Sequence, residues 1–409
     1  MKILQLFLYA LAFILLTGCR SDSVNSAEQG YTDINFYSQS ESVNLSYKEL
    51  GSPAYKQVKM EKRNGNWWNA RIPRSEAIKF FFTDNEEKVY NLGGTMGAYP
   101  GDPSEDFETS AGKVWVKNGL LFNYNPDLPK PSGELVVLTL NMHTYQEEDQ
   151  SRKFEAVAEA ISQLNPDIVA LQECAQRRDS KIVGSHNGVN IREDNMALII
   201  TNLLRSKYND NYNFYWDWSH YGFDTYEEGT AILSKYELAK MQSHYISLNH
   251  SKDFWKSRNV TMVQTDAPGI GKINVFSAHM GWWDDKEEPF KEMFDKLNDW
   301  VLSESKSADI SFICGDFNIE AGSEGYKYPM SNSKYTDAYY SANSGGFFDP
   351  TIGGRIDGWK NGDAEGKRID YMFLLKGTDL KVDLAQRIFT EKSFGRVSDH
   401  CGVYFYLSK

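Results

Sequence analysis

The apolar residues of this chain are spaced with two different periodicities. Over residues 31–125 they alternate with polar residues in short runs, such as residues 43–47, 78–82 and 113–116, which Gly, Asn and Pro interrupt. A period of two, broken by turn residues at this spacing, predicts short strands. We therefore expect a small antiparallel β-sandwich over residues 31–125.

The second pattern begins at residue 134. It follows a proline-rich segment at residues 126–133, which predicts an inter-domain linker. Apolar residues recur every three to four positions in residues 151–164 and 287–302, which predicts two helices. Strands covered by helices predict an α+β layered domain over residues 134–409. A continuous apolar run predicts a buried strand at residues 135–140, and a second buried strand is expected at residues 168–171. Further strands are predicted at residues 230–233, 260–264, 272–278, 310–314, 371–375 and 403–407.

The first 19 residues form a separate apolar segment. Lys2 precedes an almost unbroken apolar run at residues 3–16, which is too short for a spanning helix and predicts a signal peptide. The following Leu16-Thr17-Gly18-Cys19 resembles a bacterial lipobox, which implies that Cys19 is lipidated and holds an exported protein on a membrane of the cell envelope. A secreted protein with an unmodified cysteine is the alternative. Residues 20–30, rich in Ser, Asn and Gln, predict a tether.

Charge narrows the range of partners. The chain has 44 Lys and Arg against 56 Asp and Glu, so its formal net charge is −12. Proteins that bind nucleic acid usually present a basic face, because phosphate contacts supply most of the affinity. The acidic balance, with no stretch rich in Lys and Arg, disfavours a nucleic-acid partner without excluding a nuclease.

Three cysteines follow Cys19, namely Cys174, Cys314 and Cys401. An odd number cannot all pair, so we expect no disulfide framework despite export. Each lies beside or near an acidic residue or a histidine, which leaves a thiol nucleophile as one interpretation. A small buried side chain at a strand end is the interpretation we favour.

Polar residues follow or precede most of the predicted buried strands. Taken singly, each has an ordinary explanation as a surface carboxylate, a cap or a turn. Together they recur at the ends of six strands, where side chains from different strands can converge on one edge of a sheet. The motifs are Leu140-Asn141, Leu171-Gln172-Glu173, Ser277-Ala278-His279, Gly315-Asp316-Phe317-Asn318, Arg368-Ile369-Asp370-Tyr371 and Ser398-Asp399-His400.

In this order the six motifs resemble the endonuclease/exonuclease/phosphatase superfamily, which includes DNase I-like nucleases, inositol phosphatases and bacterial sphingomyelinases. The resemblance covers about residues 134–409 and implies a four-layer α/β/β/α sandwich that hydrolyses phosphoesters. It implies Glu173 as the main ligand of a Mg²⁺ or Mn²⁺ ion, with Asn141 and Asp399 as supporting residues. Asp316 is then the carboxylate that positions or activates water, and Asn318 orients it or a phosphate oxygen.

Two histidines correspond to the phosphate-facing imidazoles of that superfamily. We expect Asp370 to orient His400, and Glu228 to orient His279. A carboxylate beside an imidazole fixes its tautomer and favours the protonated ring, which suits an anionic substrate. The sequence leaves open which histidine is the acid and which the base. Arg258 is a candidate phosphate clamp, with a surface salt bridge as the alternative.

The substrate is suggested by aromatic segments that flank His279 and Glu228. Aromatic rings beside Asp and His suit stacking on sugars, although rings also stack on nucleobases or belong to a core. These segments resemble the branch that contains bacterial maltose-6'-phosphate phosphatases. The residues expected at the rim of the pocket are Trp216, Trp218, His220, Trp282 and Trp283.

The predicted β-sandwich also resembles starch-binding carbohydrate modules, in Trp67-Trp68-Asn69-Ala70-Arg71-Ile72-Pro73, Phe81-Phe82-Thr83-Asp84-Asn85 and Asn91-Leu92-Gly93-Gly94. That resemblance implies a glycan partner. Our first hypothesis is therefore a metal-dependent phosphatase that acts on a phosphorylated sugar or glycan. The alternatives are a nuclease, a phosphodiesterase acting on lipid headgroups such as a sphingomyelinase, and a non-catalytic glycan-binding surface lipoprotein.

Overall fold

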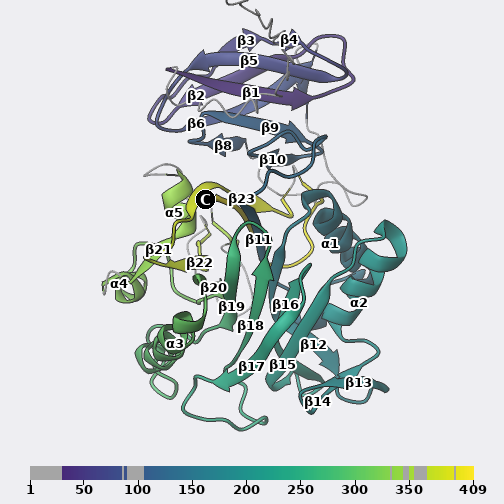
Figure 1. Cartoon of the computed structure of the whole chain (residues 1–409), viewed down its shortest axis with the longest axis vertical. Helices are drawn as coiled ribbons and strands as arrows, with labels where there is room; N and C mark the ends of the chain where they lie inside the picture. The colour runs from purple at the N-terminus through teal and green to yellow at the C-terminus, as the bar shows by residue number, and fades with distance from the viewer. Residues whose placement is uncertain are drawn as a thin grey trace, which may run out of the picture.

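A computed structural model describes residues 30–84, 87–89, 106–331, 334–343, 350–353, 366–390 and 393–409. Within these ranges the chain forms an N-terminal β-sandwich, uppermost in Figure 1, and a larger domain below it. The expected signal peptide, Cys19, residues 20–29 of the tether and the Asn91-Leu92-Gly93-Gly94 motif lie outside the described residues. Over the described ranges, we find no helix with the length and apolar character needed to cross a membrane.

The N-terminal domain consists of two facing sheets, which confirms a β-sandwich. Phe36 of one sheet stacks on Phe82 of the other, with ring centroids 3.7 Å apart. The sandwich is not wholly antiparallel, because β1 pairs with β9 in parallel. One sheet has the order β10-β9-β1-β5-β4, with bounds Leu120–Phe122, Lys113–Lys117, Tyr31–Tyr37, Trp67–Pro73 and Glu61–Lys62. The other has the order β3-β2-β6-β7, with β8 also paired to β6, and bounds Lys56–Lys59, Asn44–Glu49, Ile78–Asp84, Glu87–Val89 and Phe107–Thr109.

The larger domain is built on two six-stranded sheets. The first has the order β15-β16-β12-β11-β24-β23, with bounds Asn213–Gly222, Tyr226–Ser234, Ile168–Arg177, Glu134–Asn141, Gly402–Ser408 and Lys381–Ile388. The second has the order β17-β18-β19-β20-β22-β21, with bounds Leu238–Tyr245, Asn259–Ala267, Gly271–His279, Ile310–Asp316, Asp370–Leu375 and Tyr335–Asp337. A short hairpin, β13 (Ile182–His186) with β14 (Val189–Arg192), lies outside both sheets.

Helices cover the outer faces of the two sheets, so the domain has the four-layer α/β/β/α order expected (Figure 1). α1 (Gln150–Leu164) and α2 (Met196–Leu203) pack on the first sheet, and α3 (Phe290–Glu304) packs on the second. The core between the sheets consists of alternate side chains of their strands, such as Val137, Ile232, Val275 and Phe405. Two short helices, α4 (Glu324–Ser331) and α5 (Ala338–Asn343), complete the domain.

Helix boundaries agree with the periodicity except at the start of α3. The apolar pattern predicted a helix from residue 287, but the first helical residue is Phe290. Pro289 is extended, and the Asp285 carboxylate accepts hydrogen bonds from the main-chain N–H groups of Glu287 (2.8 Å) and Glu288 (3.0 Å). These bonds hold a turn where the pattern suggested the first helical turn, because an Asp side chain competes locally with helical hydrogen bonding.

The two domains are joined by a buried contact as well as by the connecting segment. The Tyr404 hydroxyl of β24 accepts a hydrogen bond from the Leu121 N–H (2.8 Å) and donates one to the Leu121 carbonyl (3.0 Å). Phe122 packs against Tyr406, with ring centroids 6.3 Å apart. One continuous hydrophobic cluster therefore runs from the N-terminal sandwich into the first sheet of the larger domain.

Candidate active site

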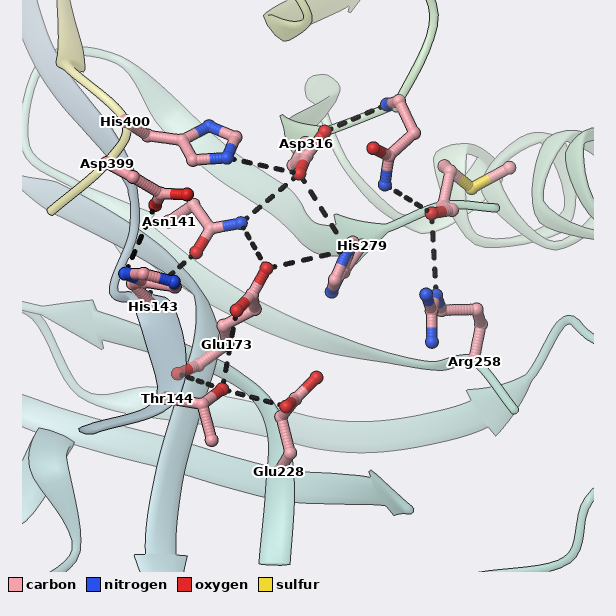
Figure 2. Close-up of polar contacts among 12 residues, drawn as sticks. Asn141, His143, Thr144, Glu173, Glu228, Arg258, His279, Asp316, Asp399 and His400 are labelled. Carbon is pink, nitrogen blue, oxygen red and sulfur yellow. Dashed lines mark hydrogen bonds and ion pairs between the residues drawn. The ribbon is translucent and has the colours of Figure 1, made fainter. Parts of the chain in front are cut away.

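The strand-end residues converge on one edge of the larger domain, where the two sheets meet (Figure 2). In the first sheet β11 and β12 are parallel and place Asn141 opposite Gln172, next to Glu173. In the second sheet the strand pairing places His279 opposite Asp316, and Asp316 opposite Asp370. Asp399 and His400 immediately precede β24 of the first sheet. Each sheet therefore contributes roughly half of the site.

Asn141 links the two sheets. Its side-chain NH₂ group donates hydrogen bonds to Glu173 Oε1 (2.8 Å) and to Asp316 Oδ2 (3.2 Å), while its amide oxygen accepts from the His143 N–H (3.0 Å). The residue is fully buried. Asn141 therefore holds two carboxylates from opposite sheets in position. The sequence had predicted it as a supporting residue of the metal ion.

Negative charge is concentrated at this edge. Burial raises the pKa of Glu173 to about 7, and the neighbouring carboxylates of Glu228 and Asp399 add to the shift. Burial likewise raises the pKa of Asp316 to about 7, with a further contribution from Asp370. Buried carboxylates in excess of nearby cations are costly unless a counter-charge is supplied.

The donor set fits a divalent cation. Oxygen ligands are what Mg²⁺ and Mn²⁺ prefer, and Glu173, His279 and Asp316 offer ligand atoms within 4.8 Å of one another. These three residues would hold such an ion, with Asn141 fixing Glu173. Asp399 belongs to another group of possible ligands, with His143 and Glu147, and its charge helps to raise the pKa of Glu173. When bound, the ion would neutralise charge on phosphate oxygens and lower the pKa of a bound water.

His400 is held as a charged ring. Its Nδ1 lies 2.9 Å from Asp370 Oδ2, which confirms the expected orientation of His400 by Asp370. Burial by itself would lower the pKa of His400, but the ion pair with Asp370 and the nearby Asp316 raise it well above its ordinary value. The other ring nitrogen, Nε2, faces Asp316 Oδ2 at 3.8 Å.

His279 has the opposite electrostatic surroundings. Burial lowers its pKa well below the ordinary value, and the positive charge of Arg258 lowers it further. Its Nε2 lies 3.7 Å from Asp316 Oδ2 and 3.9 Å from Glu173 Oε1 (Figure 2). His279 is therefore a neutral imidazole that faces the carboxylates of Asp316 and Glu173.

Glu228 does not orient His279, contrary to the expectation from the sequence. Its Oε2 accepts a hydrogen bond from the Thr144 hydroxyl (2.8 Å), and its Oε1 lies 3.4 Å from Nε2 of His220. The pairing of β15 with β16 places His220 opposite Glu228, so strand register decided this partner. His220 is itself buried, and burial together with Arg258 lowers its pKa to about 3.

A left-handed turn after β11 brings in two residues that the sequence motifs did not indicate. His143, Thr144 and Tyr145 have φ values of 54°, 36° and 59°, a conformation that costs about 1–2 kcal/mol for each residue with a β-carbon. The turn places the Thr144 hydroxyl between Glu228 and Glu173, and His143 Nδ1 beside Glu147 (2.7 Å) and Asp399 (3.6 Å). Such strain persists where the surrounding structure fixes it, commonly at functional sites.

Asn318 also has a left-handed backbone, with φ 51°. Its N–H donates to Asp316 Oδ1 (2.8 Å), and its side-chain NH₂ donates to the Met280 carbonyl (3.0 Å). The orientation of Asp316 by Asn318 that we predicted is thus provided by the main chain, while the side chain braces the segment that follows His279.

Arg258 is buried at the site and is not the surface salt bridge that was the alternative. Within the part of the chain that the structure describes, its guanidinium donates only to main-chain carbonyls, those of Trp255 (2.9 Å), Ser257 (3.2 Å) and Met280 (3.4 Å). Among the described residues no carboxylate lies within ion-pair distance of it. Burial lowers the pKa of Arg258, while Glu228, Glu173 and Asp316 act in the opposite direction from farther away.

The expected aromatic rim is only partly present. Trp216 is fully buried in the core and donates its indole N–H to the Cys174 carbonyl (2.8 Å), so its prediction as a substrate-binding residue is wrong. Trp218 lies under Lys252, whose Nζ is 3.8 Å from the ring centroid. Trp283 packs against Phe290 and Tyr328 of the helical layer.

Trp282 is the member of the expected rim that lies against the site. The Arg258 guanidinium is 5.8 Å from the centroid of its ring, within cation–π range. Its other neighbour is Trp255, with ring centroids 5.5 Å apart, which opens the segment Trp255-Lys256-Ser257-Arg258 of the predicted clamp but was not among the residues expected at the rim. Trp255 precedes Arg258 by three residues, so proximity to the clamp was the signal available in the sequence.

Comparisons with known proteins identify the catalytic domain. The sequence model of the Endonuclease/Exonuclease/phosphatase family matches residues 138–400, and the chain belongs to this family of phosphoester-cleaving enzymes. Enzymes of this family commonly use divalent metals. The structure is similar to that of an endonuclease/exonuclease/phosphatase family protein from Leptotrichia buccalis, with 27% identity and a TM-score of 0.59. That match covers 67% of this chain and all of the other.

Two further proteins are more distant. A mannosyl-6-phosphatase of Bacteroides thetaiotaomicron is 16% identical with a TM-score of 0.46, over 67% of this chain and all of that one. A Caenorhabditis elegans protein named "Putative neutral sphingomyelinase" is 21% identical over 207 residues, or 48% of this chain. The match spans less than half of that protein, 43% of its length. Similarity at these levels does not decide the substrate.

Proposed function

We propose that this chain is a divalent-metal-dependent phosphatase that acts on a phosphorylated sugar or glycan. The observation that carries the proposal is Arg258, a buried guanidinium with no carboxylate partner among the described residues, beside a centre of buried carboxylates. A buried charge without a partner is strongly unfavourable. A substrate phosphate would supply the missing negative charge on the Arg258 side, while a cation would supply positive charge on the Glu173 side.

The residues divide the work of phosphoester hydrolysis between them. Asp316, whose pKa burial raises to about 7, is placed to accept a proton from the attacking water. His400, kept protonated by Asp370, contributes positive charge and a hydrogen bond to the phosphoryl oxygens. Arg258 and the neutral His279 orient the phosphate, so that the water oxygen bonds to phosphorus in line with the bond to the sugar oxygen that breaks. The released sugar oxygen takes up a proton from solvent water.

The sugar specificity is supported by the rim and by the N-terminal domain. In that domain Trp68 is buried and donates to the Ser38 carbonyl (3.2 Å). Trp67 is half-buried, packs edge-on to Tyr37 and donates to the Asp127 carboxylate (2.7 Å), which leaves part of one ring for a glycan. We further propose that Cys19 is lipidated and that the enzyme works at the cell envelope on material outside the cytoplasm.

Phosphate release tests the proposal directly. A soluble chain starting at Ser21 should release inorganic phosphate from a panel of phosphosugars in the presence of Mg²⁺ or Mn²⁺. EDTA should abolish release, and either metal should restore it. The variant Asp399→Asn should need more metal for half-maximal activity, whereas the exposed control Asp379→Asn should behave like the wild type. No release from any phosphosugar with either metal would overturn the proposal.

A second candidate is a phosphodiesterase that acts on lipid headgroups. It is favoured by the Caenorhabditis elegans relative and by the β13–β14 hairpin, in which Ile182 and Val183 are 49% and 50% exposed. Release of phosphocholine from sphingomyelin vesicles, reduced when both residues are changed to Asp, would favour this candidate. Hydrolysis of plasmid DNA in the same assay series would instead favour a nuclease.

A further inference from the structure

We propose that Trp255 and Trp282 form an aromatic subsite that binds the face of a pyranose ring directly attached to the cleaved phosphate. The inference rests on the proposed function and deepens it, because it places the sugar ring beside Arg258. The aromatic subsite is defined by these two side chains alone.

Trp255 is unusually exposed for a tryptophan. The side chain is 54% exposed although indole rings are large and mostly apolar. Its ring lies 5.5 Å from that of Trp282 at an interplanar angle of 55°, so the two rings form an open angle and do not stack flat on each other. Lys256 lies over the Trp255 ring, with its Nζ 5.5 Å from the centroid, and the large exposed fraction of Trp255 leaves the rest of that ring available to a flat ligand.

The subsite is tied to the phosphate clamp. The Arg258 guanidinium donates to the Trp255 carbonyl (2.9 Å) and also lies over the Trp282 ring, at 5.8 Å from its centroid. Arg258 therefore contacts both aromatic residues. A phosphate that binds Arg258 brings the group attached to it against these rings, whatever that group is.

The two chain segments that carry the rings are held together by polar contacts. The buried Glu288 accepts hydrogen bonds from the N–H groups of Leu248 (2.6 Å) and Asn249 (2.8 Å). Lys256 forms ion pairs with Asp285 (2.7 Å) and Glu287 (2.6 Å). The subsite is thus fixed in advance, which reduces the entropy lost when a ligand binds.

The charges around the rings favour a hydroxylated, uncharged ring. The segment that begins at Trp282 carries four carboxylates, those of Asp284, Asp285, Glu287 and Glu288. Lys286 and the ion-paired Lys256 offset two of these four, which leaves an excess of two negative charges. Carboxylates accept hydrogen bonds from sugar hydroxyls, whereas they repel the further phosphates of a nucleic-acid strand. A pyranose meets both conditions.

The test compares one variant on two substrates. In Trp255→Ala the main-chain carbonyl that holds Arg258 remains, so the clamp should be intact. For a hexose 6-phosphate the KM should rise about tenfold with kcat unchanged within a factor of two, and Trp255→Phe should restore most of the loss. For glycerol 3-phosphate, which has no ring, KM should not change. The matched control is Tyr340→Ala, which removes an exposed aromatic residue of α5.

The outcomes separate the inference from the proposed function. Equal rises in KM for both substrates, or no rise for either, would overturn the aromatic subsite while phosphate release upheld the phosphatase. A loss seen only with a nucleoside monophosphate would overturn the assignment to sugars. If no substrate were hydrolysed, the proposed function would fail. Quenching of tryptophan fluorescence by the hexose phosphate would then decide the inference, which is upheld if Trp255→Ala loses the quenching and overturned if the wild type shows none.

Discussion

The two histidines of the active site come from different sheets and differ in charge. His400, ahead of β24 in the first sheet, is paired with Asp370 of the second sheet, and this pair raises its pKa well above the ordinary value. His279, at the end of β19 in the second sheet, has the basic groups Arg258, His220 and His400 around it, which together with burial lower its pKa. Burial lowers the pKa of both rings, so burial does not explain the difference.

The surrounding charges move the pKa values of two identical side chains apart, because carboxylates, chiefly Asp370, act on His400, whereas burial and Arg258 act on His279. Asp370 reaches across the junction of the sheets to His400, whereas Glu228, the carboxylate expected to orient His279, is turned towards Thr144 and His220. The site is therefore polarised, with an imidazolium on one side of Asp316 and a neutral imidazole on the other. An enzyme that needs both a proton donor and a neutral partner gains from that asymmetry.

Removing the carboxylate of the His400 pair should have the largest effect. In Asp370→Asn we expect kcat/KM to fall about 10²- to 10⁴-fold, the range typical of a lost acid–base group. The sign of the pH effect follows from the pKa. Asp370 raises the pKa of His400, so the imidazole of the Asp370→Asn variant should lose its proton at a lower pH. The alkaline limb of the pH–rate profile should therefore move to lower pH.

The control for this variant is Asp379→Asn, a change of an exposed residue beyond the other end of β22. Thermal melting of both variants should show whether folding is preserved. An unchanged alkaline limb in a folded Asp370→Asn protein would contradict the assignment of His400 as the charged histidine.

Changing the cation on the His279 side should have a smaller effect. Arg258→Lys keeps the charge but loses the planar fork that reaches three carbonyls, so phosphate binding should weaken. We expect KM for the substrate and Ki for inorganic phosphate to rise together, by about 10- to 100-fold. The exposed Arg63→Lys in the N-terminal domain provides the matched control. A rise in KM without a rise in Ki would show that Arg258 does not contact the phosphate.

A carboxyl group away from the site tests whether burial alone produces such pKa shifts. Burial raises the pKa of Glu134 to about 7, and its Oε2 has no hydrogen-bond partner. Since the native state binds this proton more tightly than the unfolded chain, the contribution of Glu134 to native stability should be full at low pH and fall as the pH rises from about 4.5 to about 7. Glu134→Gln should remove that loss, worth about 1 kcal/mol after allowance for partial exposure.

Urea unfolding at two pH values measures this last effect. The Gln variant should equal the wild type near pH 4 and exceed it near pH 8. The exposed Glu193→Gln should show no such difference between the two pH values. If Glu134→Gln were less stable at pH 8, the carboxylate would have a stabilising partner, and the comparison with the active-site carboxylates would not hold.

The residues at the strand ends show which features of the site could be predicted from the sequence pattern. Buried strands of continuous apolar character could be recognised singly, and the polar residue after each one followed directly, as for His279 and Asp316. The pairing of His400 with Asp370 was also predicted. Other expectations failed because they depended on register. Trp216 and Trp218 lie two residues apart on β15, yet the first is core and the second is half-buried.

The sequence by itself determined the layered α+β architecture, the order of the polar motifs and the excess of acidic charge. Tertiary structure decided which carboxylate meets which histidine, because those pairs form between strands of separate sheets. It also decided the left-handed conformation of Thr144, which a β-branched residue adopts only under external constraint. Tertiary structure also decided the position of Trp255, since only the packing of two loops brings its ring to Trp282. Local preference fixes elements, whereas contacts between distant segments fix the chemistry.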